Sequence, residues 1–414
     1  MTTKIEKTLE LRLRELETRG TLKGKETVIT GVKSAQSQRG PRFFIQGQGN
    51  KEFIRMNSNS YLGFSLRREI IEREEEYARR YGSGPGAVRF ISGTFEPHVE
   101  LERKLAAFHR REEAMLFSSA YAAVVGTITP LIDQETAIIS DELNHNCIIN
   151  AIRLSQPASR AVYRHVDMTD LERAIQAQVG MTKRVIVITD GIFSMRGDYA
   201  PLNIISELAA NYDDRFDEGV VLIVDDSHGV GAFGDTGRGT EEYTHAGGVT
   251  VLLATLGKAL GVNGGYMAAS STIVAYLRET APFYIYSNPI TPAEAGAAVA
   301  ALDILTGNDG VLLLKKLRDL TRRFEDGLES LGYEIMRSDH PIVPIMIRNT
   351  TRTSCLVRYL FEHGVLTTGI KYPVVPQGDE EIRCQISADH TASDIDYVLD
   401  ILARAHKEIN RDSC

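Results

Sequence analysis

Short apolar runs that end in polar side chains recur through the middle of the chain. Helical patterns separate them, and the four clearest runs cover residues 136–139, 184–188, 220–224 and 249–253. Strands that are buried on both faces read as continuous apolar runs, because neither face meets water. Alternation of such strands with helices predicts an α/β domain built on a mostly parallel sheet.

The flanking segments have different patterns. We expect a charge-rich amphipathic helix over residues 2–20, ending at Gly20, and a short β-excursion over 40–64. Pro289 and Pro292 break the alternation, and a long helix is expected at 293–331. The other predicted elements are helices at 67–81, 97–110, 354–363 and 392–409 and strands at 344–347, 365–375 and 381–387. The expected parts are an N-terminal helix and β-excursion (1–55), a large α/β domain (56–290) and a small α+β domain (291–414).

Composition excludes several classes of protein. The chain has 414 residues, of which 43% are apolar and 25% charged, as in ordinary globular proteins. The formal net charge of −8 argues against binding nucleic acid through bulk electrostatics. No apolar run is long enough to cross a membrane, and the charged N-terminus does not resemble a signal peptide. Four cysteines without a CxxC motif fit neither a disulfide framework nor a zinc site, so we expect a cytoplasmic protein.

Glycine is concentrated in three segments, at residues 82–93, 229–239 and 257–265. The second segment contains Gly229, Gly231 and Gly234 in a GxGxxG pattern after an apolar run, which is the signature of a dinucleotide loop. Four polar residues separate the run from these glycines, however, and the glycine-rich residues that follow cannot open a helix. The pattern is therefore only a weak indication of a dinucleotide site.

Polar side chains gather where the predicted strands end, which is where ligands bind in sheets of this type. Lys258 follows one apolar run and lies between glycines. Most lysines are exposed. A lysine that is removed from water, however, has a lowered pKa and can form an imine with a carbonyl. Asp225 ends the preceding run and is equally compatible with a pyridinium partner and with a helix cap or structural ion pair. His145, His228 and Ser194 follow other strands. No cluster supplies the ligands of a divalent metal.

Six segments, four of which contain these residues, resemble the α-oxoamine synthases, which couple an amino acid to an acyl-CoA with loss of CoA and depend on pyridoxal phosphate. The matching segments are 88–94, 139–145, 190–195, 224–228, 255–261 and 372–376. The similarity extends over the chain from about residue 40, and it is greatest to the 2-amino-3-ketobutyrate CoA ligases (glycine C-acetyltransferases). It implies the pyridoxal-phosphate transferase fold of the aspartate aminotransferase type (fold type I), with residues 56–290 binding the cofactor.

The resemblance also implies a role for each matched residue. Lys258 would hold the cofactor covalently and move protons at the substrate Cα, Asp225 would pair with the pyridinium nitrogen, and His145 would stack on the ring. His228 and Ser194 would form hydrogen bonds in the region of the ring hydroxyl. The catalytic set is therefore Lys258, His145, Asp225 and His228.

Further matched positions would bind the phosphate and the substrate. The backbone amides of Ala120 and Tyr121 and the hydroxyl of Thr255 would hold the phosphate. Ser287 would reach the phosphate in the partner subunit, which implies a homodimer. The amino-acid carboxylate would be bound by Asn59 and Arg383.

Departures from the usual pattern of the family leave the substrates open. Ala120 and Val124 replace the usual glycine and asparagine of the phosphate loop. Arg196 stands where an acidic residue commonly follows Ser-Met, and Glu381 replaces the first arginine of Arg-x-Arg. We expect glycine and a short acyl-CoA as substrates. One alternative is a longer acyl donor, as in 8-amino-7-oxononanoate synthases or serine palmitoyltransferases. The other is a different pyridoxal enzyme, such as an aminotransferase. A non-catalytic subunit would have no need of Lys258, and a dehydrogenase is the remotest alternative.

Overall fold

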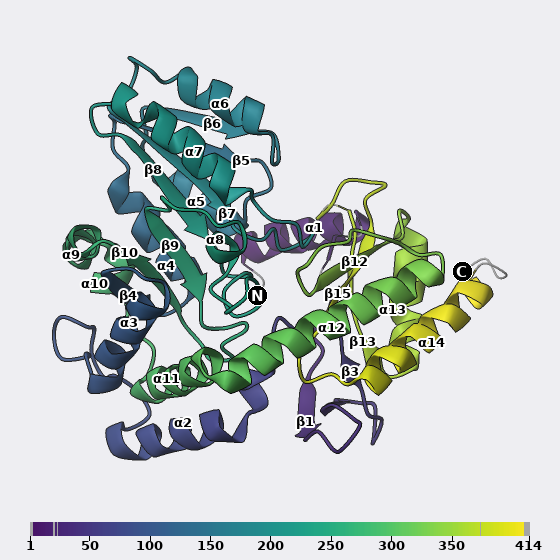
Figure 1. The fold of residues 1–414 in the computed structure, drawn as a ribbon. Helices are drawn as coiled ribbons and strands as arrows, with labels where there is room; N and C mark the ends of the chain where they lie inside the picture. Colours follow the sequence, from purple (N-terminus) through teal and green to yellow (C-terminus); the bar gives the residue numbers. More distant parts are fainter. Residues whose placement is uncertain (1–2, 20, 23, 373, 410–414) are drawn as a thin grey trace.

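The central feature of the computed structural model is a seven-stranded sheet with strand order β4-β10-β9-β8-β7-β5-β6 (Figure 1). The model describes residues 3–19, 21–22, 24–372 and 374–409, so Gly20, Pro373 and Cys414 lie outside the described residues. The strands are β4 (Glu113–Phe117), β5 (Thr136–Asp141), β6 (Ser159–Tyr163), β7 (Arg184–Asp190), β8 (Val220–Asp225), β9 (Val251–Thr255) and β10 (Gly265–Ala269). β10 is antiparallel to both of its neighbours, and the pairings among β5 to β9 are parallel. The predicted α/β fold with a mostly parallel sheet is confirmed.

The apolar runs form strands because helices cover both faces of this sheet. In β7, Ile186 and Ile188 belong to the core on one face, whereas Val185 and Val187 belong to the core on the other. This alternation is the two-residue period of a strand, and it explains why the whole run must be apolar. The surrounding helices are α3 (Glu96–Phe108), α4 (Ala120–Ile128), α5 (Asn146–Leu154), α6 (Met168–Gln176), α7 (Leu202–Tyr212), α8 (Thr240–Tyr243), α9 (Ser271–Thr280) and α10 (Pro282–Ile285).

The C-terminal part contains a second sheet, with order β11-β12-β15-β14 and antiparallel pairings throughout. Its elements are β11 (Glu334–Ile335), β12 (Ile342–Met346), β14 (Thr368–Ile370), β15 (Glu381–Gln385), α12 (Asn308–Ser330), α13 (Thr350–Glu362) and α14 (Ala392–Ile409). Chain segments from the N-terminal side join this part, because β3 (Ile54–Arg55) pairs in parallel with β13 (Val365–Leu366). The remaining elements are α1 (Lys4–Thr18), α2 (Arg68–Tyr81), β1 (Ile29–Lys33) and β2 (Arg42–Ile45).

The long helix expected at 293–331 is two helices, α11 (Pro292–Thr306) and α12, which meet at an angle of 76°. The chain turns at Gly307, and a Cβ on Gly310 would lie only 1.9 Å from the carbonyl oxygen of Leu305. The tight turn therefore requires glycine at position 310. α11 packs against α2 and α3. In the part of the chain that the structure describes, no single helix has the length and apolar character needed to cross a membrane, although this bent pair taken together has both.

Candidate active site

The carboxyl ends of the parallel strands surround a cavity that contains most of the predicted site residues. Segments that follow β5, β7, β8 and β9 contribute to it, together with the start of α4. The lining residues are Ala120, Tyr121, His145, Cys147, Asp190, Ile192, Ser194, Asp225, Ser227, His228 and Lys258. Parallel strands bring their carboxyl ends to one edge of the sheet, so residues more than a hundred positions apart converge there.

Lys258 and Asp225 provide the opposite charges of this cavity. Asp225 is the last residue of β8 and is 5% exposed, and its Oδ1 accepts a hydrogen bond from the Ser227 amide at 3.1 Å. Burial lowers the pKa of Lys258, and the carboxylates of Asp225 and Asp190 oppose that change. A lysine with a lowered pKa has more of its amine in the neutral, nucleophilic form near neutral pH.

His145 is the N-cap residue of α5, and this position makes its Nδ1 a hydrogen-bond acceptor. Its Nδ1 accepts from the Cys147 amide at 3.3 Å, and its own amide donates to Asp190 Oδ2 at 2.8 Å. Burial is the main reason why the pKa of His145 is lowered. A neutral imidazole that accepts at Nδ1 carries its proton on Nε2. The Cys147 thiol lies 2.9 Å from that Nδ1 and 3.7 Å from Asp225 Oδ2, so it packs between the two residues.

His228 is held from two sides. Its Nδ1 is 2.8 Å from the Tyr61 hydroxyl, and its carbonyl oxygen is 2.9 Å from Nε2 of His340. Burial lowers the pKa of His228 well below its usual value, and the positive charges of Lys258 and Arg383 lower it further. His228 is therefore a neutral hydrogen-bonding group in a fixed orientation.

The amino end of α4 supplies backbone amides at the same cavity, and those of Ala120 and Tyr121 have no hydrogen-bond partner among the described residues. Ser119 caps the helix by accepting from the Ala122 amide at 3.1 Å, and Ala120 and Tyr121 follow it. A helix N-terminus favours anions through its free amides and its dipole. Thr255 does not line the cavity. Its Oγ1 donates a hydrogen bond to Gly264 O at 3.2 Å and accepts one from the Gly257 amide at 3.0 Å.

Asn59 and Arg383 are brought together although 324 positions separate them. Arg383 Nη2 donates to Asn59 Oδ1 at 2.8 Å. Burial lowers the pKa of Arg383, and its Nη1 lies 3.9 Å from the sulfur of Met195, the residue after the cavity-lining Ser194. A half-buried guanidinium of this kind provides the planar fork that binds carboxylates.

Ser287, another residue predicted for the site, lies outside this cavity. It is partly buried, and its Oγ lies 3.5 Å from Asn288 O. Asp190, Cys147 and Ser227 line the cavity but were not predicted as site residues, although Asp190 ends an apolar run as Asp225 does.

The GxGxxG segment begins beside a buried carboxylate and does not form a nucleotide loop. Asp226 accepts from the amide and the hydroxyl of Thr240, at 2.6 and 2.7 Å. A Cβ on Gly229 or Gly239 would lie 2.1 or 1.9 Å from an oxygen of Asp226. No helix of the described chain begins within residues 229–239. The close approach of Asp226, whose burial raises its pKa to about 7, therefore explains Gly229. A Cβ on Gly231 or Gly234 would lie 2.5 Å from the Cβ of Ala259 or from Oε2 of Glu242, so these two glycines have other close neighbours.

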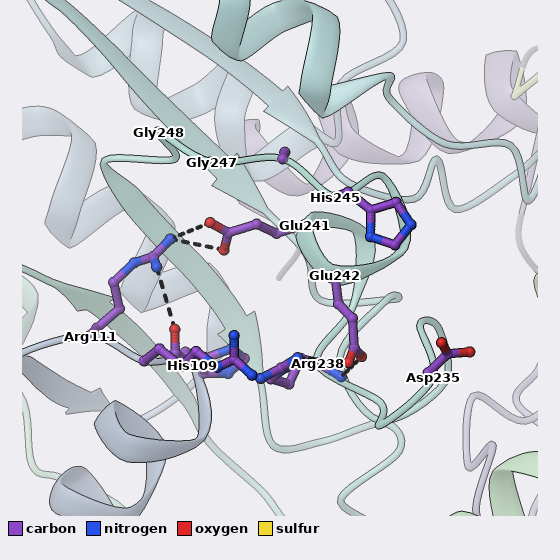
Figure 2. A pocket seen from close by; sticks show the side chains of 11 residues that line it. His109, Arg111, Asp235, Arg238, Glu241, Glu242, His245, Gly247 and Gly248 are labelled. Carbon is purple, nitrogen blue, oxygen red and sulfur yellow. Dashed lines mark hydrogen bonds and ion pairs between the residues drawn. The ribbon is translucent and has the colours of Figure 1, made fainter.

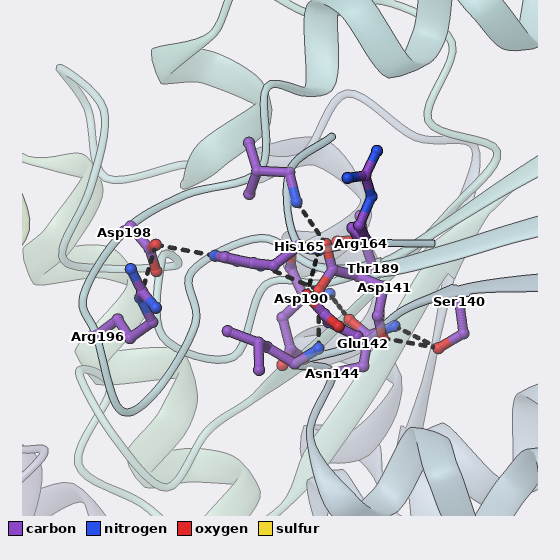
Figure 3. Close-up of polar contacts among 12 residues, drawn as sticks. Ser140, Asp141, Glu142, Asn144, Arg164, His165, Thr189, Asp190, Arg196 and Asp198 are labelled. Atoms are coloured by element: carbon purple, nitrogen blue, oxygen red, sulfur yellow. Dashed lines mark hydrogen bonds and ion pairs between the residues drawn. The ribbon is translucent and has the colours of Figure 1, made fainter. Parts of the chain in front are cut away.

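A hydrogen-bonded cluster supports the segment that carries His145 (Figure 3). His165 bridges two carboxylates, with Nδ1 3.0 Å from Asp141 Oδ1 and Nε2 2.9 Å from Asp198 Oδ2. Asn144 donates to Ile188 O at 2.9 Å and accepts from the Asp190 amide at 2.8 Å. The cluster ties the residues after β5 to the end of β7 and to the loop that contains Asp198.

A larger cavity lies among residues 109–111 and 235–248 and contains none of the predicted site residues (Figure 2). Its charges are largely paired: Arg111 Nη2 lies 2.7 and 2.8 Å from the two oxygens of Glu241, and Arg238 Nη2 lies 2.8 Å from Glu242. We therefore assign the active site to the strand ends around Lys258.

The donor set at the strand ends suits pyridoxal phosphate. Lys258 supplies an amine for an aldehyde, the α4 N-terminus suits a phosphate, and buried Asp225 suits a protonated ring nitrogen. The buried Ser227 hydroxyl has no hydrogen-bond partner among the described residues, as expected of a group that faces a ligand.

Comparisons with known proteins agree with this arrangement. The aminotransferase class I and II family model matches residues 51–402. The chain is 38% identical over 379 residues to 8-amino-7-oxononanoate synthase 1 of Bacillus velezensis, covering 91% of this chain and 94% of the relative. It is 40% identical over 390 residues to mitochondrial 2-amino-3-ketobutyrate coenzyme A ligase of Bos taurus, covering 94% and 89%.

Among solved structures, Sphingomonas wittichii serine palmitoyltransferase has the same fold, with a TM-score of 0.87 at 24% identity and coverage of 99% and 98%. The expected fold and family are thereby confirmed. The chain belongs to the class I and II aminotransferase family and, by the relatives that it matches along most of its length, to the α-oxoamine synthases.

Proposed function

We propose that this protein is a pyridoxal-phosphate-dependent acyltransferase that condenses a small amino acid with an acyl-CoA. The observation that carries the proposal is the convergence of Lys258, Asp225, His145 and His228 on one cavity, with the α4 N-terminus at its edge. The reaction joins the amino-acid Cα to the acyl carbon, breaks the thioester C–S bond and releases CoA as a thiol.

Each residue would act through the chemistry that its surroundings allow. When bound, the cofactor supplies an electron sink for negative charge at Cα. Asp225 would keep the ring nitrogen protonated, and the neutral His145 would lie against the ring. Lys258, with its lowered pKa, would remove and return the proton at Cα. Arg383 and Asn59 would hold the substrate carboxylate and orient the Cα–H bond.

Glycine with a short acyl-CoA is the favoured substrate pair, and a longer acyl donor is the second candidate. Relatives of both kinds support them about equally, because the 2-amino-3-ketobutyrate ligase of Bos taurus is 40% identical and the 8-amino-7-oxononanoate synthase of Bacillus velezensis is 38% identical. We further propose a homodimer in which Ser287 contributes to the partner's phosphate site. Other pyridoxal chemistry, such as transamination, is the alternative reaction class.

The test is a panel of amino acids and acyl-CoA thioesters, read out as free thiol. The expected result is thiol release that depends on both substrates, with absorbance of a lysine-bound pyridoxal group that disappears in Lys258→Ala. Arg323→Ala serves as a control, because this half-exposed arginine pairs with Asp396 at 2.7 Å, outside the proposed site. No thiol release with any pair, together with amino-group transfer to an oxo acid, would replace the synthase proposal by a transaminase.

A further inference from the structure

Tyr61 is a fully buried tyrosine whose hydroxyl contacts a residue of the active-site cavity. Its side-chain oxygen lies 2.8 Å from Nδ1 of His228, which lines the cavity and follows Tyr61 by 167 positions. The residue is 0% exposed, and its carbonyl oxygen accepts from the Ala388 amide at 2.7 Å. The N-terminal segment that carries Tyr61 is thus held against the C-terminal part of the chain, and the fold itself fixes the contact with His228.

The hydroxyl of Tyr61 has one proton and two acceptors near it. Nδ1 of His228 is at 2.8 Å, whereas Oδ1 of Asn59 is at 3.5 Å and already accepts from Arg383 Nη2 at 2.8 Å. A separation of 3.5 Å exceeds the usual length of an O–H···O hydrogen bond. Burial raises the pKa of the Tyr61 hydroxyl, so the group keeps its proton. The hydroxyl therefore donates to Nδ1 of His228.

This hydrogen bond determines which nitrogen of His228 carries the proton. The imidazole is neutral, because burial lowers its pKa well below the usual value. A neutral imidazole that accepts at Nδ1 carries its proton on Nε2. Nε2 has no hydrogen-bond partner among the described residues, so its N–H is available as a donor to a ligand in the cavity. The other tautomer would present a lone pair at Nε2, which an oxygen acceptor could not bind.

His340 fixes the backbone of His228. Nδ1 of His340 accepts from the Ile342 amide at 3.2 Å, so its Nε2 carries the proton and donates to the His228 carbonyl oxygen at 2.9 Å. His340 is 0% exposed, and its ring packs edge-on against Tyr61 with 5.3 Å between the ring centroids. Because His340 fixes the backbone and Tyr61 engages Nδ1, both the position and the tautomer of the His228 ring are determined.

The oxygen of the pyridoxal ring is an acceptor that requires a donor from the protein. We propose that Tyr61 is a positioning residue that keeps His228 in its Nε2–H form and thereby presents a hydrogen-bond donor to the ring oxygen of the cofactor. Such a donor is most effective when the acceptor carries negative charge. The inference rests on the role of His228 in the proposed function, and it makes cofactor binding depend on a tyrosine outside the cavity.

Nitrogen NMR of the histidine rings tests the tautomer directly, on the full chain with and without bound pyridoxal phosphate. The signals of His228 are identified by their loss in His228→Asn. We expect the proton on Nε2 in both states of the wild type, because Tyr61 rather than the cofactor determines the tautomer. In Tyr61→Phe without cofactor, both tautomers should be populated. A proton on Nδ1 in the cofactor-free wild type, or an unchanged tautomer in Tyr61→Phe, would overturn the inference.

Cofactor affinity, measured by equilibrium dialysis, tests the consequence of this tautomer. Tyr61→Phe should raise the dissociation constant for pyridoxal phosphate about fivefold, which is the weakening expected from the loss of one hydrogen bond. In a chain that carries His228→Asn, the same change should alter the constant by less than about twofold, because Tyr61 acts through the imidazole. Equal effects in the two backgrounds would mean that Tyr61 acts independently of His228, contrary to the inference.

Tyr266→Phe is the matched control for the loss of a buried hydroxyl. Tyr266 is also 0% exposed, and its hydroxyl lies 2.8 Å from Nε2 of His109, so it forms another buried tyrosine–histidine pair. Neither member of this pair lines the cavity around Lys258. Tyr266→Phe should leave the dissociation constant for pyridoxal phosphate within about twofold of the wild type. A loss of affinity as large as that of Tyr61→Phe would attribute both effects to general destabilisation and overturn the inference.

Thiol release by the wild type, measured on the same preparation, tests the proposed function separately. A wild type that binds pyridoxal phosphate but releases no thiol with any substrate pair would refute the synthase proposal and leave the Tyr61 test intact. If the wild type releases thiol but His228→Asn binds the cofactor as tightly as the wild type does, the proposed reaction stands and the role of Tyr61 is refuted.

Discussion

Individual residues in this molecule gain their properties from partners that are remote in sequence. Tyr61 fixes His228, and Asn59 contacts Arg383. The sequence indicates that a lysine, an aspartate and two histidines follow strands, because the apolar runs are continuous. It does not indicate Tyr61, since nothing local to that residue distinguishes it from an ordinary core tyrosine.

His165 gives a pH-dependent prediction at this scale. Burial alone would lower its pKa, but Asp141 and Asp198, which face its two ring nitrogens, raise the pKa to about 9 from 6.5. A pKa that is higher in the folded state stabilises the protein fully below about pH 6.5, and this contribution is lost as pH rises through about 9. His165→Gln should therefore lower the unfolding free energy by about 1–2 kcal/mol near pH 6 and by less above pH 9.5.

Denaturant unfolding of wild type and variant at the two pH values measures this difference. The exposed His406, changed to glutamine, is the control and should alter stability little at either pH. An equal loss of unfolding free energy at both pH values would mean that the charge of His165 does not contribute to stability.

At the scale of elements, strands buried on both faces were predictable and edge or glycine-containing strands were not. β5, β7, β8 and β9 have long apolar runs, whereas β6 is partly exposed at the edge and β10 contains glycine and alanine, which have little strand preference. The bend between α11 and α12 was missed although residues 306–310, Thr-Gly-Asn-Asp-Gly, interrupt the hydrophobic pattern with a turn signal. The angle of such a bend depends on what the two helices pack against, and a local pattern does not contain that information.

The junction of β10 with α4 gives the second prediction. A Cβ on Gly265 would lie 2.4 Å from the Ala120 nitrogen, so Gly265→Ala must displace the amino end of α4. We expect affinity of the apoprotein for pyridoxal phosphate to fall at least tenfold, about 1.4 kcal/mol, because the phosphate would lose its amides. Equilibrium dialysis measures this constant. Gly247→Ala is the matched control, since its Cβ would meet no atom within 4 Å, and equal affinities in both variants would contradict the phosphate assignment.

At the scale of the whole molecule, the proposed dimer determines whether one chain can form a complete site. The hydroxyl of Ser287 is outside the cavity formed by its own chain, and among the described residues it hydrogen-bonds only to the neighbouring Asn288 carbonyl. Tyr286 beside it is 80% exposed, which is unusual for a tyrosine unless another surface covers it. Both observations agree with a residue that acts in a second subunit.

Mixed dimers test this directly. Lys258→Ala lacks the amine, and Ser287→Asp would place a negative charge against a phosphate, so each variant alone should be almost inactive. If Ser287 acts across the interface, a mixed dimer contains one site with an intact lysine and an intact serine, because each comes from a different chain. Random 1:1 reassembly should then restore about a quarter of wild-type thiol release, since half of the dimers are mixed and one of their two sites is whole. If Ser287 served its own chain, both sites of every mixed dimer would be defective, and mixing would restore nothing.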